Sequence, residues 1–166
     1  MKGKIGIPQG SLYKINKRIL DLKEDCMKPR HWKILLTKLG LSKAQSEVTF
    51  YDLWSRDLNK YKNVVDDVFV IASGENVLEN MLSSIKDHWG KFDIELFRYQ
   101  SKCNLIRGWD DLFAKLDEDL NNLSSMKMSQ YYKTFEEEIA QWDSKLQKVK
   151  ITLEVWIDVQ KKWVYL

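Results

Sequence analysis

The feature that most constrains the fold is a heptad pattern in the C-terminal part of the chain. Its apolar positions follow one another in steps of four and three: Phe135, Ile139, Trp142, Leu146, Val149, Leu153, Trp156 and, after an interruption at Gln160, Trp163. This spacing predicts one long helix from about Tyr132 to the last residue. Large Trp and Phe side chains favour an irregular helical bundle over a regular two-stranded coiled coil. The helix lacks a capping Gly or Asn, and we expect it to be cut from a longer polypeptide.

Helical periodicity also covers most of the preceding chain. Apolar residues share one face from Leu12 to Leu22, and again from Val64 to Trp89, where Ser73 and Gly74 favour a kink or an interruption. Pro29 suits the first turn of a helix that Gly40 closes, and TFYDLWSRDL predicts a further short helix. The expected fold is therefore mostly α: an elongated multi-helix bundle.

One region departs from the helical pattern. In KFDIELFRY, apolar residues alternate with charged ones, and a polar turn at Gln100 and Ser101 follows before CNLI. Alternation around a polar turn predicts a β-hairpin near residues 91–107. Gly90 and Gly108 border this region, which is the break in helical periodicity that glycines flank.

Composition narrows the function classes. The chain has 166 residues, with 27 basic and 24 acidic side chains mixed along its length, and a net charge of only +3. That mixture argues against a nucleic-acid surface, which usually forms a stripe of one sign. Neither a membrane span nor a signal peptide is present in the sequence, so the cytosol is the default location.

The first 14 residues are rich in Gly and predict a flexible arm or a leftover of cloning. Seven Trp residues spread over the chain suggest core anchors.

An acidic cluster is the most suggestive local feature. RGWDDLFAKLDEDL holds five carboxylates, at Asp110, Asp111, Asp117, Glu118 and Asp119. On a helix, the apolar residues of this stretch share one face, the first four carboxylates lie opposite, and Asp119 lies at the edge. The spacing does not match a calcium loop, and paired catalytic carboxylates would need burial. We expect a solvated helix face, which a basic partner could still use for docking.

Motifs that carry chemistry are absent from the sequence. GxxxxGK[ST], GxSxG, HExxH and CxxC do not occur. His31 and His88 each precede a Trp and predict histidines packed or hydrogen-bonded at helix ends, without a metal. Cys26 and Cys103 predict reduced thiols, although a disulfide remains an alternative.

Two segments leave a functional reading open beside a structural one. MKPRHWKIL predicts either a basic, aromatic recognition patch or a helix start with Trp32 inward. SSMKMSQYYK predicts either a regulatory loop or a plain connection, in which Ser129 caps the last helix and Tyr131 and Tyr132 pack. The structural reading is favoured for both.

Several stretches together resemble one family. They are MKPRHWKILL, TFYDLW, IASGENVLENMLSSIKDHW, YQSKCNLIRGWDDLFAKL, SSMKMSQYYKTFEEEIAQWDSKL and VWIDVQKKWVYL. In this order they resemble the N-terminal part of the linker region of dynein heavy chains, and the cytoplasmic class more than the axonemal class. The resemblance covers residues 15–166, and Gln130 stands where the family usually has proline.

The resemblance implies a mechanical role. In this family the linker lies across a ring of ATPase modules and changes its angle during the nucleotide cycle, which moves tail and cargo along the microtubule towards the minus end. ATP and Mg²⁺ would bind in the ring, no cofactor would bind in this segment, and the segment itself would not be an enzyme. Its partners would be the ring and tail of the same heavy chain, with the microtubule reached only through that chain, and without nucleic acid or membrane.

Two other functions are weighed beside this one. The first is a non-motile helical scaffold that docks a partner subunit. The second is an enzyme that uses the carboxylates of residues 110–119, which would bind divalent metal in calorimetry. For contacts with the ring, the candidates are two basic residues and three aromatic residues: Lys28, Arg30, Phe92, Phe97 and Tyr99.

Overall fold

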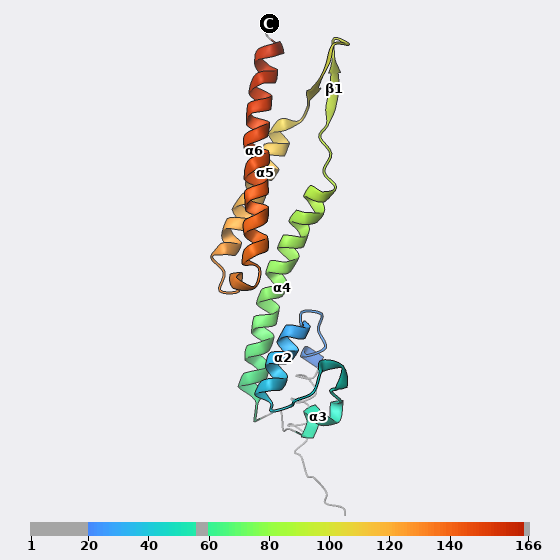
Figure 1. The fold of residues 1–166 in the computed structure, drawn as a ribbon, viewed down its shortest axis with the longest axis vertical. Helices are drawn as coiled ribbons and strands as arrows, with labels where there is room; N and C mark the ends of the chain where they lie inside the picture. The colour runs from blue at the N-terminus through green and yellow to red at the C-terminus, as the bar shows by residue number, and fades with distance from the viewer. Residues whose placement is uncertain (1–19, 56–59, 165–166) are drawn as a thin grey trace, which may run out of the picture. The chain divides into compact units, whose positions relative to one another are not determined.

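The computed structural model of the protein describes residues 20–55 and 60–164, without the side chains of Phe50 and Trp54. The predicted arm, residues 1–14, lies outside these ranges, as does most of the helix predicted from Leu12 to Leu22. The elements follow in the order α2 (Pro29–Lys38), η1 (Gln45–Glu47), α3 (Phe50–Ser55), α4 (Lys62–Gly90), β1 (Leu96–Tyr99), β2 (Cys103–Ile106), α5 (Trp109–Lys127), η2 (Tyr132–Thr134) and α6 (Glu136–Val164) (Figure 1). The prediction of a mostly α fold with one hairpin is confirmed.

The chain forms two compact units, residues 1–76 and residues 77–166. Helix α4 contributes to both units, and it remains helical through Ser73 and Gly74. An interruption at these two residues was predicted and does not occur. Membrane spans are not found: none of the helices in residues 20–55 and 60–164 combines the length and hydrophobicity that a span requires.

The first unit is built on the short helix α2. Pro29 occupies its first turn, as predicted. At its other end Gly40 has a φ of 68°, and the N–H groups of Gly40 and Leu41 donate to the carbonyls of Thr37 and Leu36. This pattern is a Schellman motif, which glycine favours because it has no Cβ. The core of the unit consists of Leu22, Cys26, Met27, Leu35, Leu39, Leu53, Val65, Val68 and Ala72.

Helix α3 begins with a capping box. The Thr49 backbone N–H and hydroxyl both donate to Asp52 Oδ2, at 2.9 Å and 2.7 Å, and the Asp52 N–H donates back to Thr49 Oγ1. Lys43 Nζ lies 2.7 Å from the other carboxylate oxygen. The hydrogen bond from Lys43, followed by those from Thr49, holds the pKa of Asp52 well below its ordinary value.

The second unit packs α5 against α6 together with the hairpin and the end of α4. Its core contains every seventh residue of α6: Ile139, Leu146, Leu153 and Gln160. The alternate heptad positions are partly exposed instead: Val149 by 38%, Trp156 by 47% and Trp163 by 43%. The expectation that all tryptophans anchor the core is therefore wrong for Trp156 and Trp163.

Helix geometry explains this departure from the predicted seam. A straight α-helix has about 3.6 residues per turn, so a strict heptad stripe drifts by about 20° per repeat. The buried stripe of α6 consequently moves onto Ile157, which is 4% exposed, while Trp156 turns away from the core. The predicted helix itself is confirmed, and it begins at Glu136 after the short 3₁₀ turn η2.

The hairpin pairs Leu96 with Ile106 and Tyr99 with Cys103 in antiparallel register. Its strands are shorter than the alternating sequence, because β1 begins only at Leu96. The turn lies at Gln100 and Ser101, as predicted, with φ angles of 45° and 58°. Positive φ at two successive residues is the requirement of the tight turns that match strand twist, and neither residue here is glycine or asparagine.

Candidate docking site

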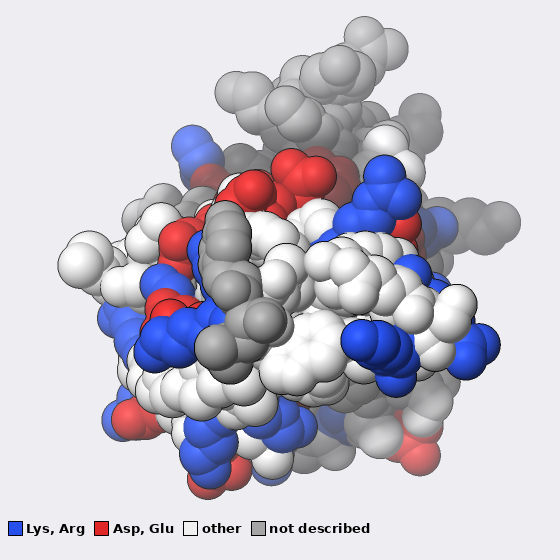
Figure 2. Space-filling model, turned by 90° about the horizontal axis from the view of Figure 1, so that it is seen from above, with Lys and Arg blue, Asp and Glu red and all other residues white. Residues whose placement is uncertain are grey.

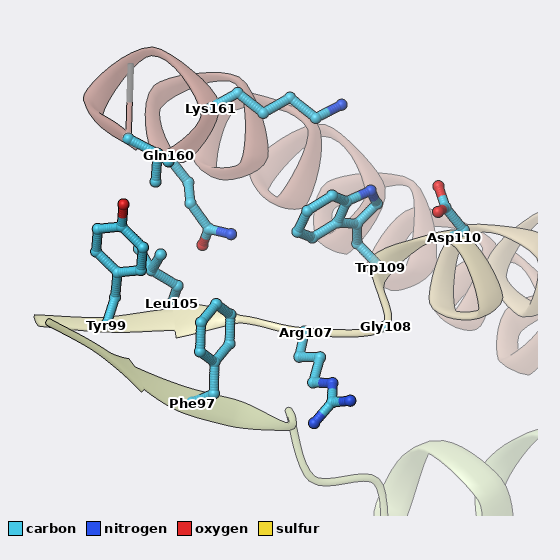
Figure 3. Close-up of a pocket in the computed structure, with 10 residues that line it drawn as sticks. Phe97, Tyr99, Leu105, Arg107, Gly108, Trp109, Asp110, Gln160 and Lys161 are labelled. Atoms are coloured by element: carbon cyan, nitrogen blue, oxygen red, sulfur yellow. The ribbon is translucent and has the colours of Figure 1, made fainter. Parts of the chain in front are cut away.

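The hairpin, the start of α5 and the end of α6 enclose an open groove of about 600 Å³. The hairpin contributes Phe97, Tyr99 and Leu105, whose side chains point toward α6 (Figure 3). Trp109 from the start of α5 and Val164 from the end of α6 also line the groove. The groove is therefore mostly apolar and aromatic, which is typical of sites that receive a ligand or a partner side chain.

A buried glutamine fixes the hairpin against α6. The Gln160 side chain is 6% exposed, and its Oε1 accepts from the Ile106 N–H at 2.8 Å while its Nε2 donates to the Ile106 carbonyl at 2.9 Å. Ile106 is fully buried, and its backbone groups on this side lack a strand partner. The amide of Gln160 thus substitutes for a neighbouring strand. Further along the hairpin, the Tyr99 and Trp163 rings meet edge to face at 6.2 Å.

A glycine makes the connection from β2 to α5 possible. Gly108 has a φ of 68°, in the left-handed region, and directly precedes Trp109, the first residue of α5. This turn places the Trp109 ring at the groove, where Lys161 Nζ lies 5.5 Å from the ring centroid. A cation at this distance is held by the face of the ring.

Polar groups occupy the edges of the groove. Lys161 reaches along one side, and Asp110 lies beyond Trp109, whereas Arg107 points away from the aromatic cluster (Figure 3). Arg107 is mostly exposed and lies 4.0 Å from Glu95. The space-filling view from above shows a broad surface of uncharged residues with Lys and Arg side chains around it and Asp and Glu side chains towards one side (Figure 2).

Comparison with known proteins identifies the family. The family model described as "Dynein heavy chain, N-terminal region 2" matches residues 11–166. The chain belongs to this dynein family. It is 57% identical over 153 residues to the cytoplasmic dynein heavy chain of Paramecium tetraurelia, 48% over 151 residues to that of Dictyostelium discoideum, and 42% over 156 residues to that of Drosophila melanogaster.

The matches cover 92%, 91% and 94% of this chain, respectively, and 3% of each relative. The chain therefore spans about 3% of the length of the dynein heavy chains that it matches. The predicted boundary between residues 1–14 and residues 15–166 stays a prediction.

Of the five predicted contact residues, the groove of this dynein segment contains two. Phe97 and Tyr99 line it, while Phe92 lies outside and packs near His88 and Trp89, with ring centroids 5.8 Å and 5.2 Å away. The other two, Lys28 and Arg30, belong to the first unit.

Arg30 has a structural partner in the first unit. Its Nε donates to Glu75 Oε2 at 2.6 Å, and His31 Nε2 lies 3.0 Å from the same oxygen. His31 is 1% exposed, and its Nδ1 accepts from the Lys28 N–H at the start of α2. Because Nδ1 accepts, Nε2 carries the hydrogen that is donated to Glu75. The prediction of a hydrogen-bonded histidine at a helix end is confirmed.

The acidic cluster divides into an exposed part and one buried residue. Asp110, Asp111, Asp117 and Glu118 are exposed, as predicted for a solvated face. The prediction of a solvated face is wrong for Asp119. This residue is 2% exposed, and its carboxylate accepts a hydrogen bond from Trp89 Nε1 at 2.8 Å. A carboxylate at the edge of an amphipathic face turns inward when a buried indole N–H requires an acceptor.

Lysines form ion pairs with three carboxylates of α5, Asp117, Glu118 and Asp119. Lys115 Nζ contacts Glu118 at 2.8 Å and Asp119 at 3.1 Å. Both hydrogen bonds raise the pKa of Lys115, and the bond to Glu118 has the larger effect. Lys150 on α6 lies 2.6 Å from Asp117, whose hydrogen bond raises the pKa of Lys150. In the described part of the chain, His, Cys, Asp and Glu side chains do not gather in threes as a metal site requires.

The connection from α5 to α6 differs in detail from its prediction. Ser124 and Ser125 belong to α5, while Ser129 Oγ accepts from the Tyr131 N–H at 3.3 Å. Ser129 therefore stabilises a turn and does not cap α6, which begins seven residues later. Tyr131 and Tyr132 pack on the core, as predicted. Cys26 and Cys103 are free thiols.

Sequence reasoning missed the groove residues Leu105, Trp109, Gln160 and Lys161. One signal was available at Gln160, because a glutamine at an apolar heptad position needs hydrogen-bond partners for its side-chain amide. Its partner, however, lies 54 residues earlier in the chain. A local pattern does not identify such a partner.

Proposed function

We propose that this segment is the N-terminal part of the linker of a cytoplasmic dynein heavy chain. It acts as a lever that transmits the ATP-driven conformational change of the motor ring to the tail, for movement towards the microtubule minus end. ATP and Mg²⁺ bind in the ring, and the segment itself carries neither a nucleotide site nor a catalytic residue. Microtubules are reached through the rest of the heavy chain, in the cytoplasm.

Family membership carries this proposal, and the construction of the second unit supports it. A lever must pass on a displacement without internal slippage, so its helices need directional contacts in addition to apolar packing. Three side-chain contacts between elements provide this directionality. Gln160 bonds α6 to β2 at Ile106, Asp119 bonds α5 to α4 at Trp89, and Lys86 on α4 pairs with Glu138 on α6.

A second candidate function is a helical scaffold that docks a partner subunit without moving. The observation that favours it is the apolar surface on the outer side of α6. Val155 and Val159 are 61% and 58% exposed, next to the half-exposed Trp156. Exposed apolar side chains that cluster on one helix face mark an interaction surface.

Removal of the segment distinguishes the two functions. Cytoplasmic dynein motors with and without residues 20–164 are compared for microtubule gliding speed and ATPase rate, on the same preparations. A lever predicts that gliding collapses while substantial ATP hydrolysis survives. A scaffold predicts that gliding and hydrolysis both persist while subunit binding is lost. A motor in which the segment is restored at the same position is the control for damage to the ring.

A further inference from the structure

The turn at the free end of the hairpin presents a hydroxyl group that the fold does not use (Figure 1). Ser101 is exposed, and its hydroxyl makes no hydrogen bond to any residue that the structure describes. A reaction at this oxygen therefore does not have to break a side-chain contact first.

Ser101 also stands in a distinctive sequence. It is the only serine or threonine of the chain that has an arginine three positions before it, which is Arg98 in the stretch RYQSK. Serine/threonine kinases that prefer basic substrates recognise an arginine at this spacing, because carboxylates beside their active site pair with the guanidinium. Ser46 has a lysine at the same spacing, but this lysine, Lys43, is paired with Asp52 at 2.7 Å.

The charged side chains of the hairpin strands and turn have one sign. From Leu96 to Ile106 the sequence contains Arg98 and Lys102 and no acidic residue. Among the residues that the structure describes, neither cation is paired with a carboxylate. The guanidinium of Arg98 donates instead to the Ser101 carbonyl at 3.4 Å, which is a weak hydrogen bond. Both cations are therefore available, first to the acidic site of a kinase and afterwards to a phosphate on Ser101.

The conformation of the turn favours its opening. Gln100 and Ser101 have left-handed φ angles of 45° and 58°, which cost free energy in residues other than glycine. The hairpin is anchored far from the turn, where the Gln160 amide bonds the N–H and the carbonyl of Ile106. Local opening can therefore give the extended conformation that a kinase binds while this anchor stays in place.

We propose that Ser101 is a phosphorylation site for a serine/threonine kinase that prefers basic substrates. Ser101 Oγ attacks the γ-phosphorus of ATP, and a new O–P bond forms while the bond from this phosphorus to the bridging oxygen of ADP breaks. The hydroxyl proton passes to a carboxylate of the kinase. The phosphate carries a charge of about −1.5 to −2, so it nearly cancels the two positive charges of Arg98 and Lys102.

This inference goes beyond the proposed function and does not depend on it, because a kinase would act on the turn in a lever and in a scaffold alike. Incubation of the purified heavy chain with ATP, Mg²⁺ and the catalytic domain of a calcium/calmodulin-dependent protein kinase tests it. That kinase class selects arginine three residues before the acceptor. Mass spectrometry of the modified peptides should find phosphate on Ser101 and none on Ser46. A heat-denatured sample is treated in parallel.

Two alanine variants of the same hairpin provide the matched comparison. Arg98→Ala should lower the initial rate of Ser101 phosphorylation by at least about tenfold, because it removes the guanidinium that the kinase binds. Lys102→Ala removes one positive charge from the other side of Ser101 and should leave the rate within about twofold. Arg98→Lys keeps the charge without the fork geometry, so it should also slow the reaction, and it serves if Arg98→Ala does not fold.

The proposal fails if Ser101 stays unmodified, or if it is modified only in the heat-denatured sample. It also fails if the two alanine variants slow the reaction equally. Gliding is scored independently by removal of the segment. A motor that needs the segment for gliding but takes no phosphate on Ser101 would refute the phosphorylation site and leave the lever intact.

Discussion

Gln160→Leu provides a direct test of how the hairpin is held, because two arguments predict opposite signs. The heptad pattern of α6 predicts that leucine completes the apolar stripe and stabilises the protein. The structure predicts the reverse, since the substitution removes both hydrogen bonds to Ile106 and leaves its N–H and carbonyl buried. Each buried group without a partner costs about 1–3 kcal/mol, whereas burial of a leucine side chain contributes about 1.5–3 kcal/mol. We expect a net loss of about 1–3 kcal/mol in the free energy of unfolding.

Urea unfolding of the chain, followed by Trp fluorescence, measures this loss. Gln147→Leu is the matched control, because Gln147 lies on the same helix, is exposed, and bonds only to Asp143 on that helix. An exposed substitution of this kind should change the free energy of unfolding by less than about 0.5 kcal/mol. If Gln160→Leu leaves the protein equally stable or more stable, the glutamine does not hold the hairpin and the reasoning is refuted.

Three further predictions concern single sites. The hydrogen bond from Lys43 is the main cause of the lowered pKa of Asp52, so the ionised carboxylate stabilises the fold above the ordinary carboxyl pKa, and this stabilisation is lost as pH falls through the lower pKa of the folded state. The stability difference between wild type and Asp52→Asn, measured by urea unfolding from pH 7 to pH 2, should therefore shrink as the pH falls. A constant difference would contradict this. Ser101→Gly should stabilise the hairpin by about 1 kcal/mol, because glycine accepts the φ of 58° without strain; an unchanged thermal midpoint would count against turn strain. Gly108→Ala should destabilise by about 1–2 kcal/mol at a φ of 68°, whereas Gly90→Ala, in the last turn of α4 with open space around it, should be neutral or stabilising; equal effects in urea unfolding would exclude a conformational role for Gly108.

Local patterns in the sequence predict those parts of the fold that depend on neighbouring residues. The long C-terminal helix, the helix closed by Gly40 and the turn at Gln100 and Ser101 follow from periodicity and from turn composition. The solvated face of α5 follows in the same way for four of its five carboxylates. Each of these features is decided within a few residues of chain, where propensity and the hydrophobic pattern agree.

The remaining features depend on residues far apart in the chain. Asp119 is buried because Trp89, 30 residues earlier, needs an acceptor, and Gln160 is buried because Ile106, 54 residues earlier, lacks a strand partner. Of these long-range contacts, the one made by Gln160 lies at the groove, and among the residues that line the groove only Phe97 and Tyr99 were predicted as contact residues.

The same long-range polar contacts explain why apolar packing alone would make a poor lever. Apolar side chains interdigitate and resist compression, but the free energy of burial itself hardly depends on direction. A hydrogen bond between buried groups depends steeply on distance and angle, and a displaced register leaves its donor and acceptor without partners. Gln160 on Ile106 and Asp119 on Trp89 each fix one element relative to another at a single position. If the segment is the linker proposed above, we expect these contacts to pass a force applied at the hairpin on to α6.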